Sequence, residues 1–255
     1  MLTPLMPVVF LGHGSPMNAL EQNTYTDAWQ QLGQNLPRPK AILCLSAHFA
    51  GDGSLAVTVD KPQTIHDFYG FSQQLFDMQY PAPGSPALAQ RVMELLPEAR
   101  ATDKWGLDHG AWSVLVHLYP RADIPVVQLS LDLSLQPEQQ MALGARLALL
   151  REEGVLILGS GNVVHNLRLV NPRMQQPFPW ALDFDRAIAD LVQAGDFAGV
   201  AKWPSLPGAR ESVPTTEHFV PLLYVLGAAG QGELVKTLCQ QYVFGSLSMT
   251  GFVIG

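Results

Sequence analysis

The chain has 255 residues, of which 47% are hydrophobic and 15% are charged, so it contains enough apolar material for one large buried core. Its formal net charge is −7 and it has no run of lysine or arginine, which argues against a nucleic acid or an anionic membrane surface as a partner. No segment contains the roughly 20 uninterrupted apolar residues that a membrane-spanning helix needs.

The predicted elements begin in the apolar stretch 1–10, which has no basic leader and leads into a glycine-rich loop, so we expect a buried strand rather than a signal peptide. Apolar runs and stretches of helical periodicity then alternate, and this alternation predicts a layered α/β domain. The predicted strands are residues 8–11, 41–46, 124–131, 154–158 and 246–254, and the predicted helices are residues 26–33, 87–96, 110–119, 137–151, 181–194 and 217–227.

Two details of these elements bear on the fold and on the cellular compartment. Pro137 suits the first turn of its helix, where its missing N–H costs nothing, and Ser134 is a candidate cap. The two cysteines, Cys44 and Cys239, are too few and too far apart for a disulfide framework or a zinc knuckle. We expect one globular domain in the reducing cytoplasm, and the sequence does not indicate an oligomeric state.

Five of the seven histidines occupy related positions. His13, His48 and His165 come at or just past the ends of predicted strands, His109 starts a predicted helix, and His218 lies in the first turn of the last predicted helix. Ends of parallel strands share one edge of a sheet, so these imidazoles can converge on zinc or ferrous iron and also supply an acid/base group. A single histidine at a strand end is more often a hydrogen-bonded loop residue, so the pattern alone leaves both interpretations open.

The other two histidines and the glycine motifs are interpreted differently. His117, inside an apolar predicted helix, is expected to be packed or partly exposed, and His66 is expected to line a loop near the site rather than to bind metal. The glycines at 12–14 and 159–161 do not complete the G-x-S-x-G spacing of a serine hydrolase, and they match neither a P-loop nor a dinucleotide motif. A serine hydrolase is therefore disfavoured, and a nucleotide site is excluded.

Six motifs occur in order along the chain: Leu-Gly-His-Gly-Ser-Pro at 11–16, Ser-Ala-His at 46–48, Ile-His-Asp-Phe at 65–68, Asp-His-Gly at 108–110, Gly-Ser-Gly-Asn-Val-Val-His-Asn at 159–166 and Glu-His-Phe-Val-Pro-Leu-Leu at 217–223. Together they resemble the DODA-type group of 4,5-DOPA extradiol dioxygenases, which is related to class III ring-cleavage enzymes such as protocatechuate 4,5-dioxygenase. The resemblance covers nearly the whole chain. It implies a single α/β domain of the class III extradiol dioxygenase type, with a central mixed β-sheet flanked by helices.

The resemblance also implies which residues hold a metal. His13, His48 and His218 would be ligands, and His165 would lie at or beside the metal, either as a fourth ligand or as an acid/base. In broader class III relatives a glutamate is the third ligand, and here Glu217 is the neighbour of His218. Adjacent helical residues point about 100° apart, so we expect only one of the two to reach the metal, and we favour His218. Glu217 would otherwise be a carboxylate favoured by the helix dipole.

The implied reaction is extradiol opening of an aromatic diol such as DOPA by dioxygen. Oxygen activation requires a redox-capable ion, which means ferrous iron, Fe(II), whereas an all-histidine site also suits zinc, Zn(II). We expect His165, or as second choice His109, to act as the acid/base group.

Four further residues are candidates for substrate contact. Phe49, Tyr69 and Trp112 could stack on the aromatic ring, and Arg168 could bind a substrate carboxylate. The alternatives are core packing for the three aromatic residues and a surface ion pair for the arginine.

Two rival functions use the same histidines. A zinc-dependent non-redox enzyme would turn over its substrate without oxygen. A metal-stabilised binding protein would hold an aromatic ligand without converting it.

Overall fold

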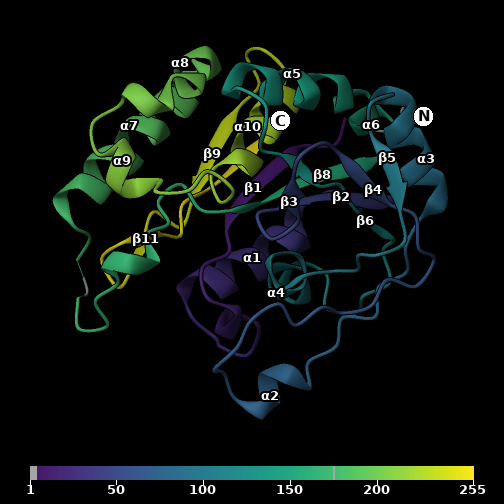
Figure 1. Ribbon diagram of the computed structural model, residues 1–255, viewed down its shortest axis with the longest axis horizontal. Helices are drawn as coiled ribbons and strands as arrows, with labels where there is room; N and C mark the ends of the chain where they lie inside the picture. Colours follow the sequence, from purple (N-terminus) through teal and green to yellow (C-terminus); the bar gives the residue numbers. More distant parts are fainter. Residues whose placement is uncertain (1–4, 175) are drawn as a thin grey trace.

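The centre of the fold is a six-stranded mixed sheet in the order β6-β2-β8-β1-β12-β9 (Figure 1). The computed structural model describes residues 5–174 and 176–255, so the first four residues of the apolar N-terminal stretch lie outside it. β6 (Val126–Gln128), β2 (Ala41–Ser46), β8 (Val155–Gly161) and β1 (Val8–Gly12) run parallel, whereas β12 (Gly251–Ile254) pairs antiparallel with β1 and with β9 (Val235–Leu238). The expected central mixed sheet is confirmed.

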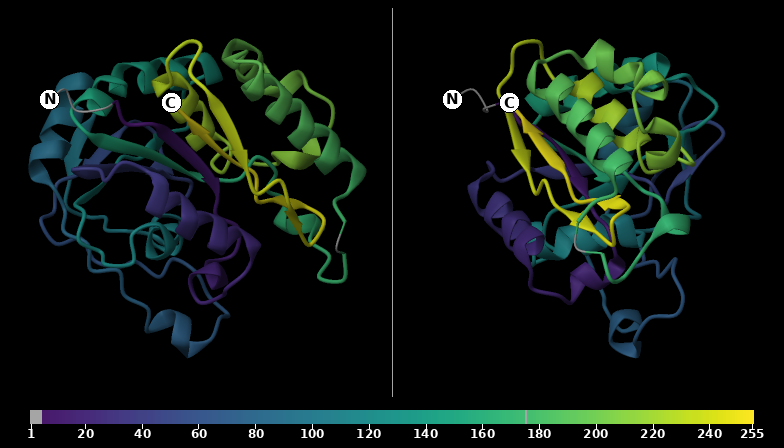
Figure 2. Two further views of the ribbon diagram at one scale, coloured as in Figure 1. Left: turned by 180° about the vertical axis from the view of Figure 1, so that it is seen from behind. Right: turned by 90° about the vertical axis from the view of Figure 1, so that its left-hand side faces the viewer.

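Helices cover both faces of this sheet (Figures 1 and 2). Successive strand residues alternate between two cores: Val8 and Phe10 belong to one, and Val9 and Leu11 to the other. Burial on both faces explains why the parallel strands are continuous apolar runs rather than alternating ones. The first core is completed by α5 (Pro137–Leu147), α7 (Pro179–Gln193) and α10 (Val220–Ala228), and the second by α1 (Thr24–Asn35) and α4 (His109–Leu118).

None of the helices within the described ranges is long and apolar enough to cross a membrane.

Short elements connect and border these layers. The short elements are β3 (Ala50–Gly51), β4 (Leu55–Val57), β5 (Arg100–Thr102), β7 (Leu131–Asp132), β10 (Tyr242–Val243), β11 (Leu247–Ser248), α2 (Gln73–Phe76), α3 (Pro86–Leu95), α6 (Leu149–Glu152), α8 (Phe197–Ala201), α9 (Ala209–Ser212) and the 3₁₀ turns η1 (Pro16–Ala19), η2 (Leu167–Leu169) and η3 (Trp203–Ser205).

Three predicted elements are each two elements in the structure. The strand predicted at 124–131 splits into β6 and β7 because the chain leaves β2 and pairs next with β3. The strand predicted at 246–254 splits into β11 and β12, which have different partners. The helix predicted at 137–151 breaks at Ala148 into α5 and α6.

The last predicted helix begins later than expected, at Val220 instead of Glu217. The physical reason is Pro221, which has no N–H to donate and is tolerated only in the first turn of a helix. Glu217 and His218 therefore lie on a turn before α10 rather than on the helix. Ser134 is not the cap of α5 either, because Gln136 holds that position and Ser134 donates to Asp132 instead.

The feature that positions the site is the edge where three adjacent parallel strands end together. β8 lies between β2 and β1, and the register aligns Ser46 with Ser160 and Gly12 with Gly161. Residues that follow these strands must therefore start from one short line at the carboxyl edge of the sheet, where open α/β sheets bind ligands.

Candidate metal centre

Five histidines converge on one cavity at this edge. His13 follows β1, His48 follows β2 and His165 follows β8, while His109 is the first residue of α4 and His218 lies in the turn before α10. All five line a cavity of about 500 Å³. The structure thus brings together every histidine that the sequence placed at a strand end or helix start.

The tautomer of His13 follows from its hydrogen bonds. Its Nδ1 lies 3.0 Å from the hydroxyl oxygen of Ser160, and that hydroxyl donates its single proton to the carbonyl oxygen of Gly110 at 2.5 Å. Ser160 must therefore accept from His13, which places the imidazole proton on Nδ1. The Nε2 atom of His13 keeps a free lone pair.

The Asp67 carboxylate lies against the Nδ1 atoms of two further histidines. His109 Nδ1 donates to one carboxylate oxygen at 2.9 Å, and His48 Nδ1 lies 3.3 Å from the other. The backbone N–H of His109 also donates to the Asp67 carboxylate. Partial burial alone would raise the pKa of Asp67, but these bonds from His109 and the nearby His48 lower it, so the carboxylate stays ionised. With Nδ1 as donor, His109 has a free lone pair on Nε2, and His48 gains one when its proton lies on Nδ1 beside Asp67.

The Glu217 carboxylate does the same for His218. His218 Nδ1 lies 3.2 Å from Glu217 Oε1, which also accepts from the hydroxyl of Thr215. Of the two neighbours that could reach a metal, His218 shares a group of potential ligands with His13 and His48, whereas Glu217 groups with His165 and His218. Glu217 thus supports the imidazole of His218 through its Nδ1, as carboxylates commonly do for metal-bound histidines.

The spacing of His13, His48 and His218 fits one metal ion. Their ligand atoms all lie within 4.8 Å of one another, and the Nε2 atoms of His13 and His48 are 3.2 Å apart. Two nitrogens bound to the same tetrahedral ion at about 2.05 Å would be roughly 3.3 Å apart. In the tautomer that has its proton on Nε2, His48 donates to His13 Nε2; a cation bound here would replace that proton, and Asp67 would then accept the proton of His48 Nδ1.

The buried histidines are held in the neutral form that metal binding requires. Burial, reinforced by the neighbouring histidines, lowers the pKa of His13 and of His218 well below its ordinary value. Burial and His109 lower the pKa of His48, and burial lowers the pKa of His165 to about 4. At neutral pH these four imidazoles are therefore uncharged and offer lone pairs rather than protons.

His165 differs from the other four histidines in its geometry. Its ring stacks on that of His218 with centroids 3.4 Å apart and planes only 5° from parallel. A ring nitrogen offers its lone pair in the plane of the ring, so two stacked rings direct their lone pairs along parallel planes and not at one point. Within the described ranges its ring nitrogens make no hydrogen bond, which leaves them able to exchange a proton in the cavity.

Backbone packing brings the His218 turn against the end of β8. The N–H of Asn162 donates to the carbonyl oxygen of His218 at 2.8 Å, and a side chain at Gly161 would collide with that same carbonyl. On the opposite side, Asp108 caps α4 through the N–H of Ala111. The position of His109 therefore depends on this cap.

Of the four predicted substrate contacts, Tyr69 lines the cavity and the other three do not. Tyr69 is 91% exposed. Phe49 is buried and stacks on Trp105, and Trp112 is fully buried with its indole N–H donating to the carbonyl of Ile65, so neither lines the cavity. These two aromatic residues are in the core because they point inward from the elements that carry the site.

Arg168, the predicted carboxylate contact, is exposed on η2 and does not line the cavity either. The two histidines set apart in the sequence also lie outside it. His66 hydrogen-bonds the carbonyl of Met78, and the half-buried His117 hydrogen-bonds that of Asn18.

Sequence reasoning missed the groups that orient the imidazoles and those at the mouth of the cavity. Asp67 and Ser160 lie inside the ordered motifs. A search of these motifs for side chains that could accept a hydrogen bond from a histidine Nδ1 could have identified them. Leu167, Val170 and Phe244 come from segments without any motif, and only the folded chain brings them to the cavity.

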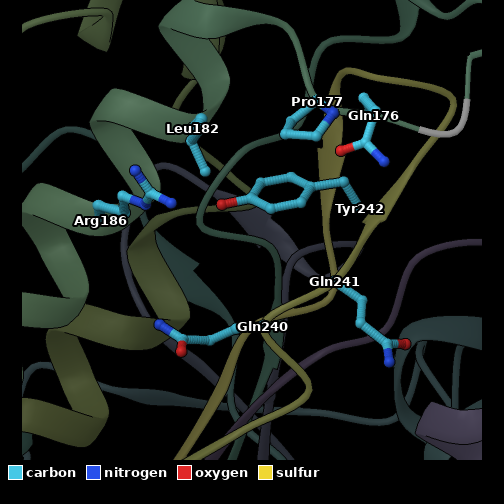
Figure 3. A pocket seen from close by; sticks show the side chains of 7 residues that line it. All are labelled: Gln176, Pro177, Leu182, Arg186, Gln240, Gln241 and Tyr242. Carbon is cyan, nitrogen blue, oxygen red and sulfur yellow. The ribbon is translucent and has the colours of Figure 1, made fainter.

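A second cavity of about 540 Å³ lies between α7 and β10 (Figure 3). Figure 3 shows Arg186 extending from α7 toward the hydroxyl of Tyr242, with the Gln240 amide on the same side and the Gln241 side chain pointing away. No histidine, cysteine or carboxylate lines it among the residues that the structure describes. The histidine cavity is therefore the better candidate for metal chemistry, although it is the slightly smaller of the two.

Comparison with known proteins identifies a family of aromatic ring-opening dioxygenases. Residues 6–253 match the family described as the catalytic LigB subunit of aromatic ring-opening dioxygenase. The chain is 48% identical to the 4,5-DOPA dioxygenase extradiol of Escherichia coli K12, over 98% of this chain and 95% of that protein. It is 37% identical to the 4,5-DOPA dioxygenase extradiol of Beta vulgaris, over 94% of this chain and 92% of that protein.

A solved structure has the same fold. The crystal structure of an uncharacterized protein from Escherichia coli K12 superimposes with a TM-score of 0.86 at 43% identity, and the match covers 98% of this chain and 100% of that one.

Proposed function

The chain belongs to the family of the catalytic LigB subunit of aromatic ring-opening dioxygenase, and on that premise we propose that it opens a catechol such as DOPA by 4,5-extradiol cleavage. Enzymes of this family are metal-dependent and act on an aromatic substrate with dioxygen. The observation that carries the proposal is the histidine cluster, in which ligand atoms of His13, His48 and His218 lie within 4.8 Å of one another.

We assign the metal to His13, His48 and His218. The donor set suits both zinc and ferrous iron, and the reaction selects ferrous iron because zinc has no redox chemistry of its own. The chemistry that bound ferrous iron supplies is chelation of the two catechol oxygens, a lower pKa for their protons, and electron transfer from the ring to dioxygen.

His165 is the acid/base group in this proposal. Its imidazole is neutral at pH 7, stacks beside His218 and faces the cavity without a hydrogen-bond partner in the described chain, so it can accept the phenolic proton. Because burial lowers its pKa to about 4, His165 does not retain a proton at neutral pH and returns it to the opened product. The stacked geometry supports this role over that of a fourth ligand.

His109 and the Asp67 carboxylate also line the cavity. Asp67 accepts a hydrogen bond from His109 and lies 3.3 Å from His48 Nδ1, so the carboxylate holds the two rings relative to each other. Among the predicted aromatic contacts, Tyr69 is the one whose position supports a role in substrate binding. The two free cysteines support a reducing cytoplasmic location, and the family match over residues 6–253 supports one catalytic domain for residues 1–255.

The test is anaerobic reconstitution with ferrous iron followed by addition of oxygen and DOPA. We expect oxygen uptake in equal amount to DOPA consumed, and a yellow ring-opened product. The same protein loaded with zinc is the control and should take up no oxygen. Turnover with zinc and without oxygen would instead establish a non-redox metalloenzyme, and catechol binding without product would establish a binding protein.

A further inference from the structure

The mouth of the histidine cavity is apolar. Nine large hydrophobic side chains are exposed on the described surface, and five of them line this one cavity. We call these five the rim: Tyr69, Phe71, Leu167, Val170 and Phe244. Exposed apolar side chains that cluster around one cavity, instead of being spread singly over the surface, indicate a site that binds an apolar group.

One rim residue is held in place at a conformational cost. Phe244 has a φ of 54°, in the left-handed region that residues other than glycine rarely adopt. The backbone N–H of Asn171 donates to its carbonyl oxygen and fixes this conformation. Strained backbone of this kind occurs preferentially at functional sites, and here it places an aromatic ring at the cavity mouth.

The cavity offers no counter-charge for a charged substituent. Within the described ranges no lysine or arginine side chain lines it, and Arg168 is exposed outside it. Asp67, its lining carboxylate, is already engaged by His48 and His109. A carboxylate or an ammonium group that loses its water at the rim would therefore gain no ionic partner, and such desolvation is unfavourable.

A catechol bound with its diol at the histidines would direct its substituent to this rim. Ring position 4 lies on the side of the ring away from the hydroxyls, and the rim residues line the same cavity as the histidines. A volume of about 500 Å³ falls in the range of pockets that hold drug-sized ligands, which leaves room beyond a single ring.

From these observations we infer that the cavity selects catechols with an uncharged, apolar substituent at position 4 over those with a carboxylate or amino-acid side chain. The inference rests on the proposed function, because it describes the substrate of the same site. DOPA would then be a substrate of low efficiency rather than the preferred one. Each methylene buried at the rim should raise kcat/KM by roughly fourfold.

The test compares 4-propylcatechol with 3-(3,4-dihydroxyphenyl)propanoate, which has the same chain length but ends in a carboxylate, and with DOPA. We expect kcat/KM of the iron-loaded enzyme to be at least tenfold higher for 4-propylcatechol than for the other two. Anaerobic calorimetric titration, in which no turnover occurs, should give the same order of affinities. Equal or higher efficiency with DOPA or the propanoate overturns the inference and leaves the proposed function standing. Absence of oxygen uptake with all three catechols overturns both.

A charge introduced at the rim sharpens the test. Leu167→Arg, at a side chain that is 61% exposed, should raise kcat/KM for the propanoate about fivefold and lower it for 4-propylcatechol. Leu149→Arg is the matched control, because Leu149 is 50% exposed on α6 and lies outside the cavity. If Leu167→Arg leaves both substrates unchanged, the rim does not contact the substituent and the inference is wrong. Val170→Arg repeats the test should Leu167→Arg not fold.

Discussion

The two ends of the cavity are built in opposite ways. Its floor consists of His13, His48, His109, His165 and His218 with Asp67; three of the histidines follow strands, His109 begins α4, and Asp67 and His218 lie on connecting segments. Nearly every group of the floor is hydrogen-bonded to a named acceptor or donor. The rim comes from loops and η2, is apolar and is exposed. This difference indicates that the floor sets the chemistry, whereas the rim sets which ring substituents are accepted.

The largest expected effect comes from removing a ligand in the floor. His13→Ala and His48→Ala should each lower kcat/KM by at least about 1,000-fold, because the two imidazoles that remain bind the ion too weakly to retain it. Metal content after reconstitution and oxygen uptake are the measurements. His117→Ala, in which a half-buried histidine outside the cavity is removed, is the control and should retain both. Full activity of His13→Ala with stoichiometric iron would refute the proposed site.

His165 separates an acid/base role from a ligand role. His165→Gln should lower kcat by roughly 100- to 10,000-fold while iron remains stoichiometric, since the stacked ring is proposed to move protons and not to bind metal. Iron content and kcat are measured on the same sample. Loss of iron together with activity would show that His165 is a fourth ligand.

Ser160 tests whether the tautomer of His13 matters. Ser160→Ala removes the acceptor for His13 Nδ1, so metal affinity should fall about 10- to 100-fold in a competition titration with a chelator. Ser113→Ala is the matched control, because Ser113 is a buried serine whose hydroxyl has no partner among the described residues. Equal affinities for the two variants would exclude the orienting role.

The neutral histidines of the floor make the metal-free protein sensitive to acid. Unfolded histidines take up protons near pH 6.5, whereas in the folded chain His165 does so only near pH 4, and the pKa values of His13 and His218 are also lowered. The unfolded state thus binds more protons between these values, and the free energy of unfolding falls as pH falls, by at most about 1.4 kcal/mol per pH unit for each histidine.

Urea unfolding of the chelator-treated protein at pH 7 and pH 5 measures this loss. Burial raises the pKa of Asp185, which acts in the opposite direction and reduces the loss at the acid end. Unchanged or higher stability at pH 5 would contradict the neutral histidine cluster.

The smallest expected effect concerns the rim. Phe244→Gly should leave the free energy of unfolding unchanged or raise it by up to about 1 kcal/mol, because glycine adopts a φ of 54° without strain. KM for 4-propylcatechol should rise severalfold with little change in kcat, since the floor is intact. A large fall in kcat would show that the rim also takes part in the chemistry, contrary to separate roles for floor and rim.

The sequence by itself determined where the parallel strands lie, although β8 extends to Gly161 and not to 158, and it placed the histidines that follow them. Residues 41–46 form β2 as predicted, and the histidines after β1, β2 and β8 converge because parallel strands that pair in register end on one line. Local signals suffice for this, since an apolar run and the glycine turns beside it are encoded within a few residues.

Only the tertiary structure decided the partners of the imidazoles and the composition of the rim. Ser160 lies 147 residues from His13 along the chain, and Phe244 lies between β10, which the sequence did not predict, and β11. The start of α10 at Val220 likewise moved His218 onto a turn. Such contacts join segments that are distant in sequence, so they follow from how the helices and the last strands pack on the sheet, and no local periodicity reports them.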